Sequence, residues 1–133
     1  MKKIFTLIAL CLSLAAVAGL SEPQQLVVVE KIAKEHRRQM HIENFDDVES
    51  YVEKVTKARL NELMKNNSEV EAPLDSDQVA SLQACMKRSK TCSLFLISLT
   101  GSWYGGDVRT HSYVLLNPET GKTEEIMHEV YAE

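Results

Sequence analysis

The sequence predicts an α+β domain in which N-terminal helices pack on a C-terminal antiparallel meander. Three observations support this fold class. The chain has 133 residues, which corresponds to one domain. Apolar residues recur at helical spacing as far as residue 88, and after residue 92 they form short runs separated by turn residues. The composition, 44% hydrophobic and 26% charged, is that of a folded domain and argues against a disordered, collagenous or multi-span membrane chain.

Three helices are expected, over residues 23–39, 46–66 and 76–88. Ser21 is a suitable N-cap for the first. Asp46 with Glu49 three residues later resembles a capping box, and apolar residues follow at near-helical spacing, which predicts the second. Asp75 with Gln78 gives the third helix the same kind of start, and two basic residues suit its C-terminus.

Three strands are expected after the helices, over residues 92–100, 108–117 and 122–131. The first is a nearly continuous apolar run, typical of a strand buried on both faces. Residues 101–107 contain three of the five glycines and are expected to form an irregular loop. Residues 118–121 read Pro-Glu-Thr-Gly, a four-residue turn. If Asn117 pairs with Lys122 across that turn, then His111 lies directly opposite His128.

The first residues have the layout of a secretory signal. Lys2 and Lys3 precede an uncharged apolar stretch, and residues 16–18 form a small-x-small cleavage site. We therefore expect a signal peptide at residues 1–18 and one exported domain at residues 19–133. The Lys-Lys start looks bacterial, so the periplasm is the expected location, with secretion from the cell as an alternative. Residues 4–20 are also long enough to be retained as an inner-membrane anchor; after cleavage no membrane association is expected.

The charge balance limits the partners. Fifteen Lys and Arg against nineteen Asp and Glu give a formal charge of −4, and loss of Lys2 and Lys3 with the signal changes it to −6. No basic run is long enough to follow a phosphate backbone, so nucleic acid is not expected as a partner. The expected partner is an unidentified envelope or secreted protein. Oligomeric state is not indicated by the sequence.

The cysteines indicate a disulfide bond. Signal cleavage removes Cys11 and leaves Cys85 and Cys92 in an oxidising compartment, where an even pair is usually bridged. Their spacing, with six residues between them and no second pair, does not fit a zinc ribbon or a Cys-x-x-Cys redox motif.

The predicted binding residues lie in and beside the glycine-rich segment 101–107. Trp103 is the only Trp in the chain and is followed by Tyr104. Large aromatic side chains on a loop are good contact residues, which predicts a non-enzymatic binding or inhibitory module. Ser102, Asp107 and Arg109 complete the predicted binding set. The opposite interpretation is that Trp103 folds back and completes the core.

Two other functions remain open at this stage. A small enzyme would use His111 or His128 as a general base with Ser102 or Asp107 nearby, although no catalytic motif is present. A purely structural envelope protein would have a buried Trp103 and no cavity. Two imidazoles opposite each other, with Cβ atoms ~5 Å apart, could share a metal ion, but two ligands do not make a site. No metal or other cofactor is therefore predicted. No motif places the chain in a known family.

Overall fold

The computed structural model of the protein describes residues 19–70 and 72–132, so the predicted signal peptide lies outside the described residues. The elements, in chain order, are α2 (Glu22–Ile42), β1 (Asp46–Lys54), α3 (Lys57–Lys65), the short 3-10 helix η1 (Asn67–Glu69), α4 (Ser76–Lys87), β2 (Ser93–Trp103), β3 (Gly106–Leu116) and β4 (Thr123–Ala132).

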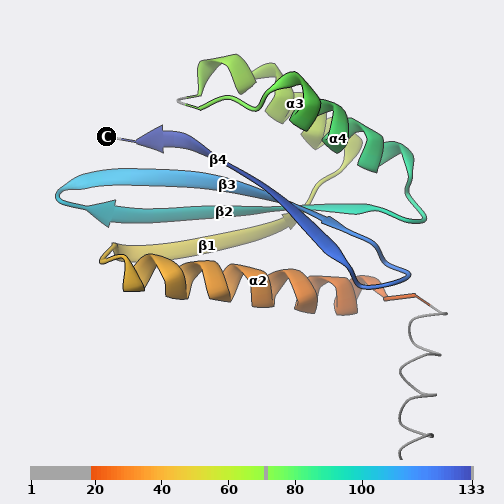
Figure 1. The fold of residues 1–133 in the computed structure, drawn as a ribbon, viewed down its shortest axis with the longest axis horizontal. Coiled ribbons are helices and arrows are strands. Elements are labelled where there is room, and N and C mark those ends of the chain that lie inside the picture. The colour runs from red at the N-terminus through yellow and green to blue at the C-terminus, as the bar shows by residue number, and fades with distance from the viewer. Residues whose placement is uncertain (1–18, 71, 133) are drawn as a thin grey trace, which may run out of the picture.

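The strands form one antiparallel sheet in the order β1-β2-β3-β4. Helix α2 lies along one face of the sheet, and α3 and α4 lie over the other (Figure 1). Each face carries its own apolar core, one beneath α2 and one beneath α3 and α4. The predicted α+β class and the antiparallel sheet are confirmed, but the sheet in the described residues has four strands instead of three.

Helix α2 begins where its capping signal predicts. The Ser21 side chain accepts a hydrogen bond from the Gln24 N–H, and the Gln24 side chain accepts one from the Ser21 N–H. The helix covers the predicted residues 23–39 and continues to Ile42. Val29 and Ala33 are fully buried against the sheet, and His36 contacts Glu125 of β4. Apolar packing and this polar contact together fix α2 on its face.

The predicted helix over residues 46–66 is wrong in its first half, because residues 46–54 form β1 and only 57–65 are helical, as α3. Strand β2 is largely buried on both faces, and in a three-stranded meander it would be an edge strand with unpaired backbone groups. Strand β1 pairs with those groups and places Val52 opposite Ile97. Helix α3 then begins after Thr56, whose side chain accepts a hydrogen bond from the Arg59 N–H (3.2 Å).

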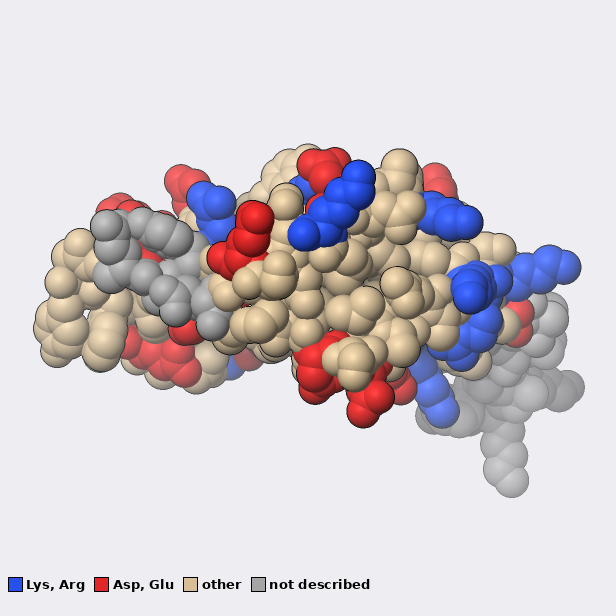
Figure 2. All heavy atoms as spheres, turned by 90° about the horizontal axis from the view of Figure 1, so that it is seen from above, with Lys and Arg blue, Asp and Glu red and all other residues tan. Residues whose placement is uncertain are grey.

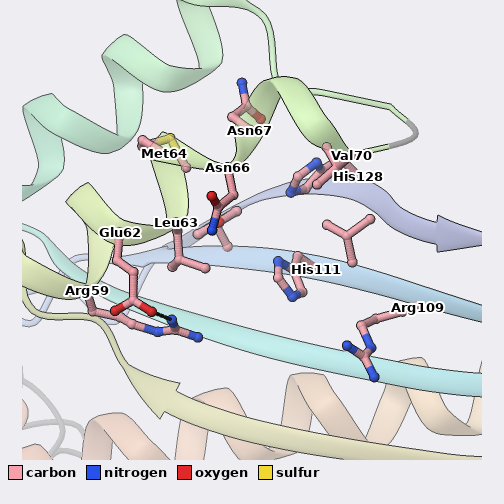
Figure 3. A pocket seen from close by; sticks show the side chains of 12 residues that line it. Arg59, Glu62, Leu63, Met64, Asn66, Asn67, Val70, Arg109, His111 and His128 are labelled. Atoms are coloured by element: carbon pink, nitrogen blue, oxygen red, sulfur yellow. Dashed lines mark hydrogen bonds and ion pairs between the residues drawn. The ribbon is translucent and has the colours of Figure 1, made fainter.

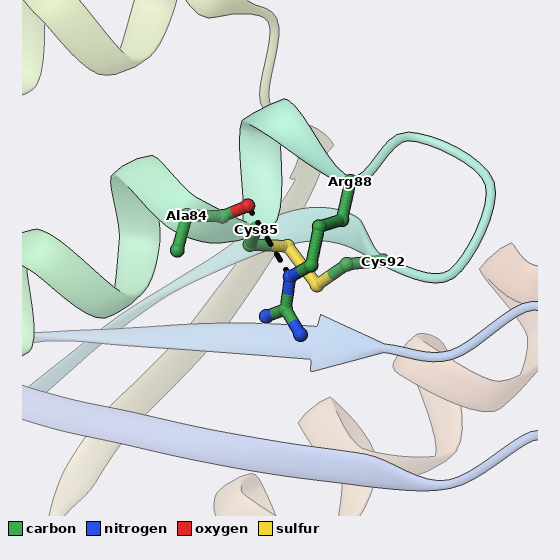
Figure 4. The surroundings of a disulfide bond; sticks show 4 residues. All are labelled: Ala84, Cys85, Arg88 and Cys92. Atoms are coloured by element: carbon green, nitrogen blue, oxygen red, sulfur yellow. Dashed lines mark hydrogen bonds between the residues drawn. A yellow bond between two sulfur atoms is a disulfide. The ribbon is translucent and has the colours of Figure 1, made fainter.

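Helix α4 confirms the third predicted helix and ends one residue earlier than expected, at Lys87. The predicted capping pair is present, with the Gln78 N–H donating to Asp75 (2.8 Å). Cys85 in its last turn is disulfide-bonded to Cys92, just before β2, with Cα atoms 5.2 Å apart (Figure 4). The disulfide therefore joins the end of α4 directly to the sheet.

The predicted loop over residues 101–107 is wrong. Strand β2 runs to Trp103 and β3 starts at Gly106, so only Tyr104 and Gly105 form the turn. Both have positive φ, +49° and +80°, as in the type I′ turns of two-residue hairpins. Gly101 is a strand residue with a packing role, since a Cβ there would lie 2.7 Å from Met40 Cε. The absence of a side chain at Gly101 allows Met40 to pack closely against the strand and does not mark irregular structure.

The register of β3 and β4 is the predicted one. The Asn117 N–H donates to the Lys122 carbonyl (2.8 Å), which closes the four-residue turn at 118–121. His111 lies opposite His128, and pairing shifts only beyond Thr110. The strands predicted at 92–100, 108–117 and 122–131 are thus present with displaced ends.

Candidate functional site

The tip of the β2–β3 hairpin carries a group of aromatic rings, which we call the aromatic tip: Phe45, Trp103 and Tyr104. The Trp103 and Tyr104 ring centroids lie 4.7 Å apart, and Phe45 lies 6.2 Å from Trp103. Trp103 is 49% exposed and Tyr104 is 92% exposed. Trp103 therefore does not complete the core, and both rings are accessible at the turn end of the hairpin.

Tyr104 occupies a backbone position that its side chain disfavours. Its φ of +49° lies in the left-handed region, where turns of this type usually have Asn, Asp or Gly. A bulky residue in that region costs about 1 kcal/mol or more. Because the ring is almost fully exposed, burial does not offset this cost. The fold alone gives no reason for a tyrosine at this position.

The other predicted binding residues lie on the opposite face of the hairpin. Ser102 and Arg109 alternate with Trp103 in the pleat, so they face the side of α3 and α4, whereas Trp103 lies beside Phe45 at the end of α2. The Ser102 hydroxyl donates a hydrogen bond to Asp107 (2.9 Å). The five predicted residues therefore do not form one surface.

A second site lies between α3 and the sheet, in a cleft of about 400 Å³ (Figure 3). We call it the histidine cleft. The residues that line it are Arg59, Glu62, Leu63, Met64, Asn66, Asn67, Val70, Arg109, His111, Tyr113, His128 and Val130. The sheet contributes both histidines from neighbouring strands, and α3 with the residues after it forms the facing wall.

The aromatic rings of the cleft hold one another in position. The His111 and His128 centroids lie 5.8 Å apart, and Tyr113 stacks on His128 at 5.9 Å. His128 Nδ1 lies 3.1 Å from the carbonyl oxygen of Ala72. A carbonyl only accepts, so Nδ1 carries the proton and Nε2 presents a lone pair. Within the described residues, this Nε2 is buried and has no hydrogen-bond partner.

Both histidines are neutral at neutral pH. Burial lowers the pKa of His111 to about 4, with further contributions from His128 in its protonated form and from the positive charges of Arg109 and Arg59. Burial also lowers the pKa of His128, against the smaller opposing effect of its bond to Ala72. Burial raises the pKa of Tyr113 to about 12. Among the described residues that line the cleft, the charged ones at neutral pH are therefore the two arginines and Glu62.

The geometry does not assemble the catalytic group considered from the sequence. Ser102 and Asp107 line a separate hollow that contains neither histidine. The structure brings His111 and His128 together but keeps the predicted nucleophile and acid away from them. In the part of the chain that the structure describes, no three or more His, Cys, Asp or Glu side chains are arranged to hold a metal ion.

The facing wall of the cleft was not found by sequence reasoning. Arg59 pairs with Glu53 and with Glu62, both at 3.1 Å. These contacts depend on β1 ending at Lys54 and α3 beginning three residues later, and the sequence predicted one continuous helix there. The spacing of Arg59 and Glu62, three apart, was the one available signal.

Charges are mixed on the face that carries α3 and α4. Both basic and acidic side chains are visible on this face, the basic ones mostly toward the right-hand end, with uncharged residues between them (Figure 2). This face offers no continuous basic track of the kind that follows a nucleic acid backbone.

Comparison with known proteins identifies no relative: no family model, curated protein or solved structure matches the chain. Among the helices of the described residues, none combines the length and the apolar character needed to cross a membrane.

Proposed function

We propose that the protein is a small exported binding module that contacts another envelope or secreted protein through the aromatic tip, without catalysis of its own. The observation that carries the proposal is the pair of exposed rings at the hairpin end, one of them held in a left-handed turn. Backbone strain is retained where side-chain placement matters, and exposed Trp and Tyr are frequent anchors in protein interfaces. The tip is also held on a rigid base, since β2 is the most buried strand and is joined to α4 through Cys92.

The tip makes a testable prediction. Trp103→Ala and Tyr104→Gly should each reduce capture of the partner from envelope extract by about tenfold or more. Trp103→Ala should change the free energy of unfolding by no more than about 1 kcal/mol, because half of the ring is already exposed. Tyr104→Gly should raise it by about 0.5–1 kcal/mol, because glycine adopts the left-handed turn without strain.

The measurements are affinity capture with the immobilised mature domain and urea denaturation. Tyr51→Ala is the matched control, since Tyr51 is 65% exposed on β1 and lies five residues along the paired strand from Trp103. The Tyr51→Ala variant should capture the same proteins as the wild type. Equal capture by wild type and both tip variants would contradict the proposal, as would a loss of ~3 kcal/mol in Trp103→Ala, which would make the ring part of the core.

We also propose that the module acts in the periplasm after removal of residues 1–18. A disulfide in a chain of this size is typical of an oxidising compartment, which supports export. Intact-mass measurement of protein recovered from the periplasm should give a chain that starts at Gly19. A full-length species retained in the inner membrane would contradict this placement.

A further inference from the structure

The histidine cleft has the shape and lining of a small-molecule site. Its volume of about 400 Å³ lies in the range of ligand pockets. The α3 side contributes the apolar side chains of Leu63 and Met64, and the sheet contributes Tyr113 and Val130. These residues would enclose an apolar chain of six to eight carbons on two sides. None of them belongs to the aromatic tip.

The charge of the lining favours an anion. Arg59 is neutralised by its two carboxylate partners, Glu53 and Glu62. Arg109 is exposed and forms no ion pair within the described residues, although the whole chain carries −4. The cleft therefore combines apolar walls with a guanidinium that has no ion-pair partner among the described residues, although Asp47, Glu49 and Asp107 line the neighbouring hollow that Arg109 also borders. A guanidinium can hold a carboxylate through two parallel hydrogen bonds.

His111 is placed to add a second donor. It lies two residues from Arg109 on β3, so both side chains lie on the same face of the sheet and line the cleft, with the Arg109 guanidinium directed toward β2 (Figure 3). Neither ring nitrogen of His111 has a hydrogen-bond partner among the described residues, and a neutral imidazole always keeps one N–H. The guanidinium and this N–H can therefore meet one carboxylate.

We propose that the histidine cleft binds a small monocarboxylate with an apolar chain, its carboxylate held by Arg109 and His111 and its chain lying against Leu63, Met64 and Val130. The site is separate from the aromatic tip and does not depend on the proposed function. A bound carboxylate would place a negative charge beside His111, which has no carboxylate hydrogen-bonded to it among the described residues of the free protein. His111 faces Arg109, Arg59, Glu62, His128 and Tyr113 in the cleft and Glu49 in the hollow beside it, and of these groups the two glutamates are negative.

The test uses sodium octanoate as the probe, with the mature protein and isothermal titration calorimetry at pH 7. We expect saturable binding at one site with a Kd of about 1 mM or lower. Octyltrimethylammonium, which has the same chain and the opposite charge, should bind at least tenfold more weakly. Equal affinity for the two probes, or no saturable octanoate binding, would overturn the proposal.

Variants locate the binding. Arg109→Met should weaken octanoate about tenfold and leave octan-1-ol binding unchanged, whereas Arg88→Met should change neither. Arg88 is the matched control because its guanidinium lies near Ala84 at the disulfide end, outside the cleft (Figure 4). Asn66→Trp, at an exposed position on the cleft wall, should block both probes by filling the space. An equal loss in Arg88→Met, or unchanged binding in Asn66→Trp, would overturn the assignment.

Two further readouts separate this site from the tip. Trp103→Ala should bind octanoate as the wild type does, so loss of partner capture and loss of octanoate binding are independent outcomes. In ¹H–¹³C spectra, saturating octanoate should raise the pKa of His111 by about one unit or more. An unchanged His111 titration would contradict its contact with the carboxylate.

Discussion

Removal of the disulfide should lower the free energy of unfolding by about 2–3 kcal/mol. Cys85 and Cys92 close a short loop, with a sequence separation of seven, and such a loop restricts the unfolded chain by about this amount in the chain-entropy model. Both cysteines lie in the core beneath α3 and α4, beside Leu82 and Leu94, so loosening the link also loosens the packing of α4 on β2. For a domain of this size the melting temperature should fall by roughly 10 °C.

Urea denaturation of the oxidised protein, the reduced protein and the Cys85→Ala/Cys92→Ala double variant measures this effect. The oxidised mature protein should not react with a thiol reagent until it is reduced. Reductant should not change the free energy of unfolding of the double variant. This control excludes an effect of the reductant on anything other than the disulfide. A double variant as stable as the oxidised wild type would show that the bridge contributes nothing to the folded state.

The elements that the sequence predicted correctly are those set by local contacts. The N-cap Ser21 and the capping pair of Asp75 and Gln78 each act within one helical turn, and both helices begin where these residues predict. The turn at 118–121 acts in the same local way, and it fixed the pairing of His111 with His128. Half of the candidate ligand site could therefore be placed from the sequence.

The elements that sequence reasoning missed depend on distant parts of the chain. Residues 46–54 have apolar spacing that fits either a strand or a helix, and pairing with β2, more than 40 residues later, decides the outcome. Once that segment becomes β1, α3 is free to place Arg59 and Leu63 over the sheet. The α3 side of the cleft could not be predicted for this reason, because α3 can lie over the sheet only if β1 ends at Lys54.

The glycine-rich hairpin was misread for a different physical reason. Three glycines within seven residues indicate irregular structure, but the role of Gly101 is to let Met40 and Phe45 approach the strand. Trp103 and Tyr104 are nevertheless exposed, because a two-residue turn exposes its residues as a loop does. Local chemistry thus identified Trp103 and Tyr104 as candidate contact residues, but it left open whether Trp103 is exposed, and it did not predict the turn.

Stability should decline as the pH falls from about 6.5 to about 4, and His111 should account for a measurable part of the decline. Burial and the charges of His128, Arg109 and Arg59 lower the pKa of His111 to about 4 in the folded protein, whereas its ordinary value is 6.5. Between these values the unfolded chain binds the proton and the folded protein does not. The contribution of His111 is therefore fully present above pH 6.5 and is lost progressively down to pH 4.

The expected loss follows from the size of this shift. It corresponds to roughly 3 kcal/mol for a fully buried ring, and solvent screening of a half-buried one reduces the loss to about 1–2 kcal/mol. His111→Gln keeps a polar side chain but cannot titrate, so its stability should decline less steeply than that of the wild type over this range. His128→Gln should also flatten the decline, because it removes both a lowered pKa and a neighbouring positive charge.

The difference between wild-type and variant curves is the informative quantity, since ion-paired carboxylates such as Glu22 and Glu35 also lose their partners in acid. Urea denaturation at intervals from pH 7.5 to pH 4 gives both curves. His41→Gln is the control, because His41 is exposed on α2 and its variant should follow the wild type throughout. Parallel curves for wild type and His111→Gln would mean that the ring is protonated as easily in the folded protein as in the unfolded chain. The carboxylate proposed for the cleft would then meet a histidine that is already accessible to solvent, and the coupling between binding and protonation would be lost.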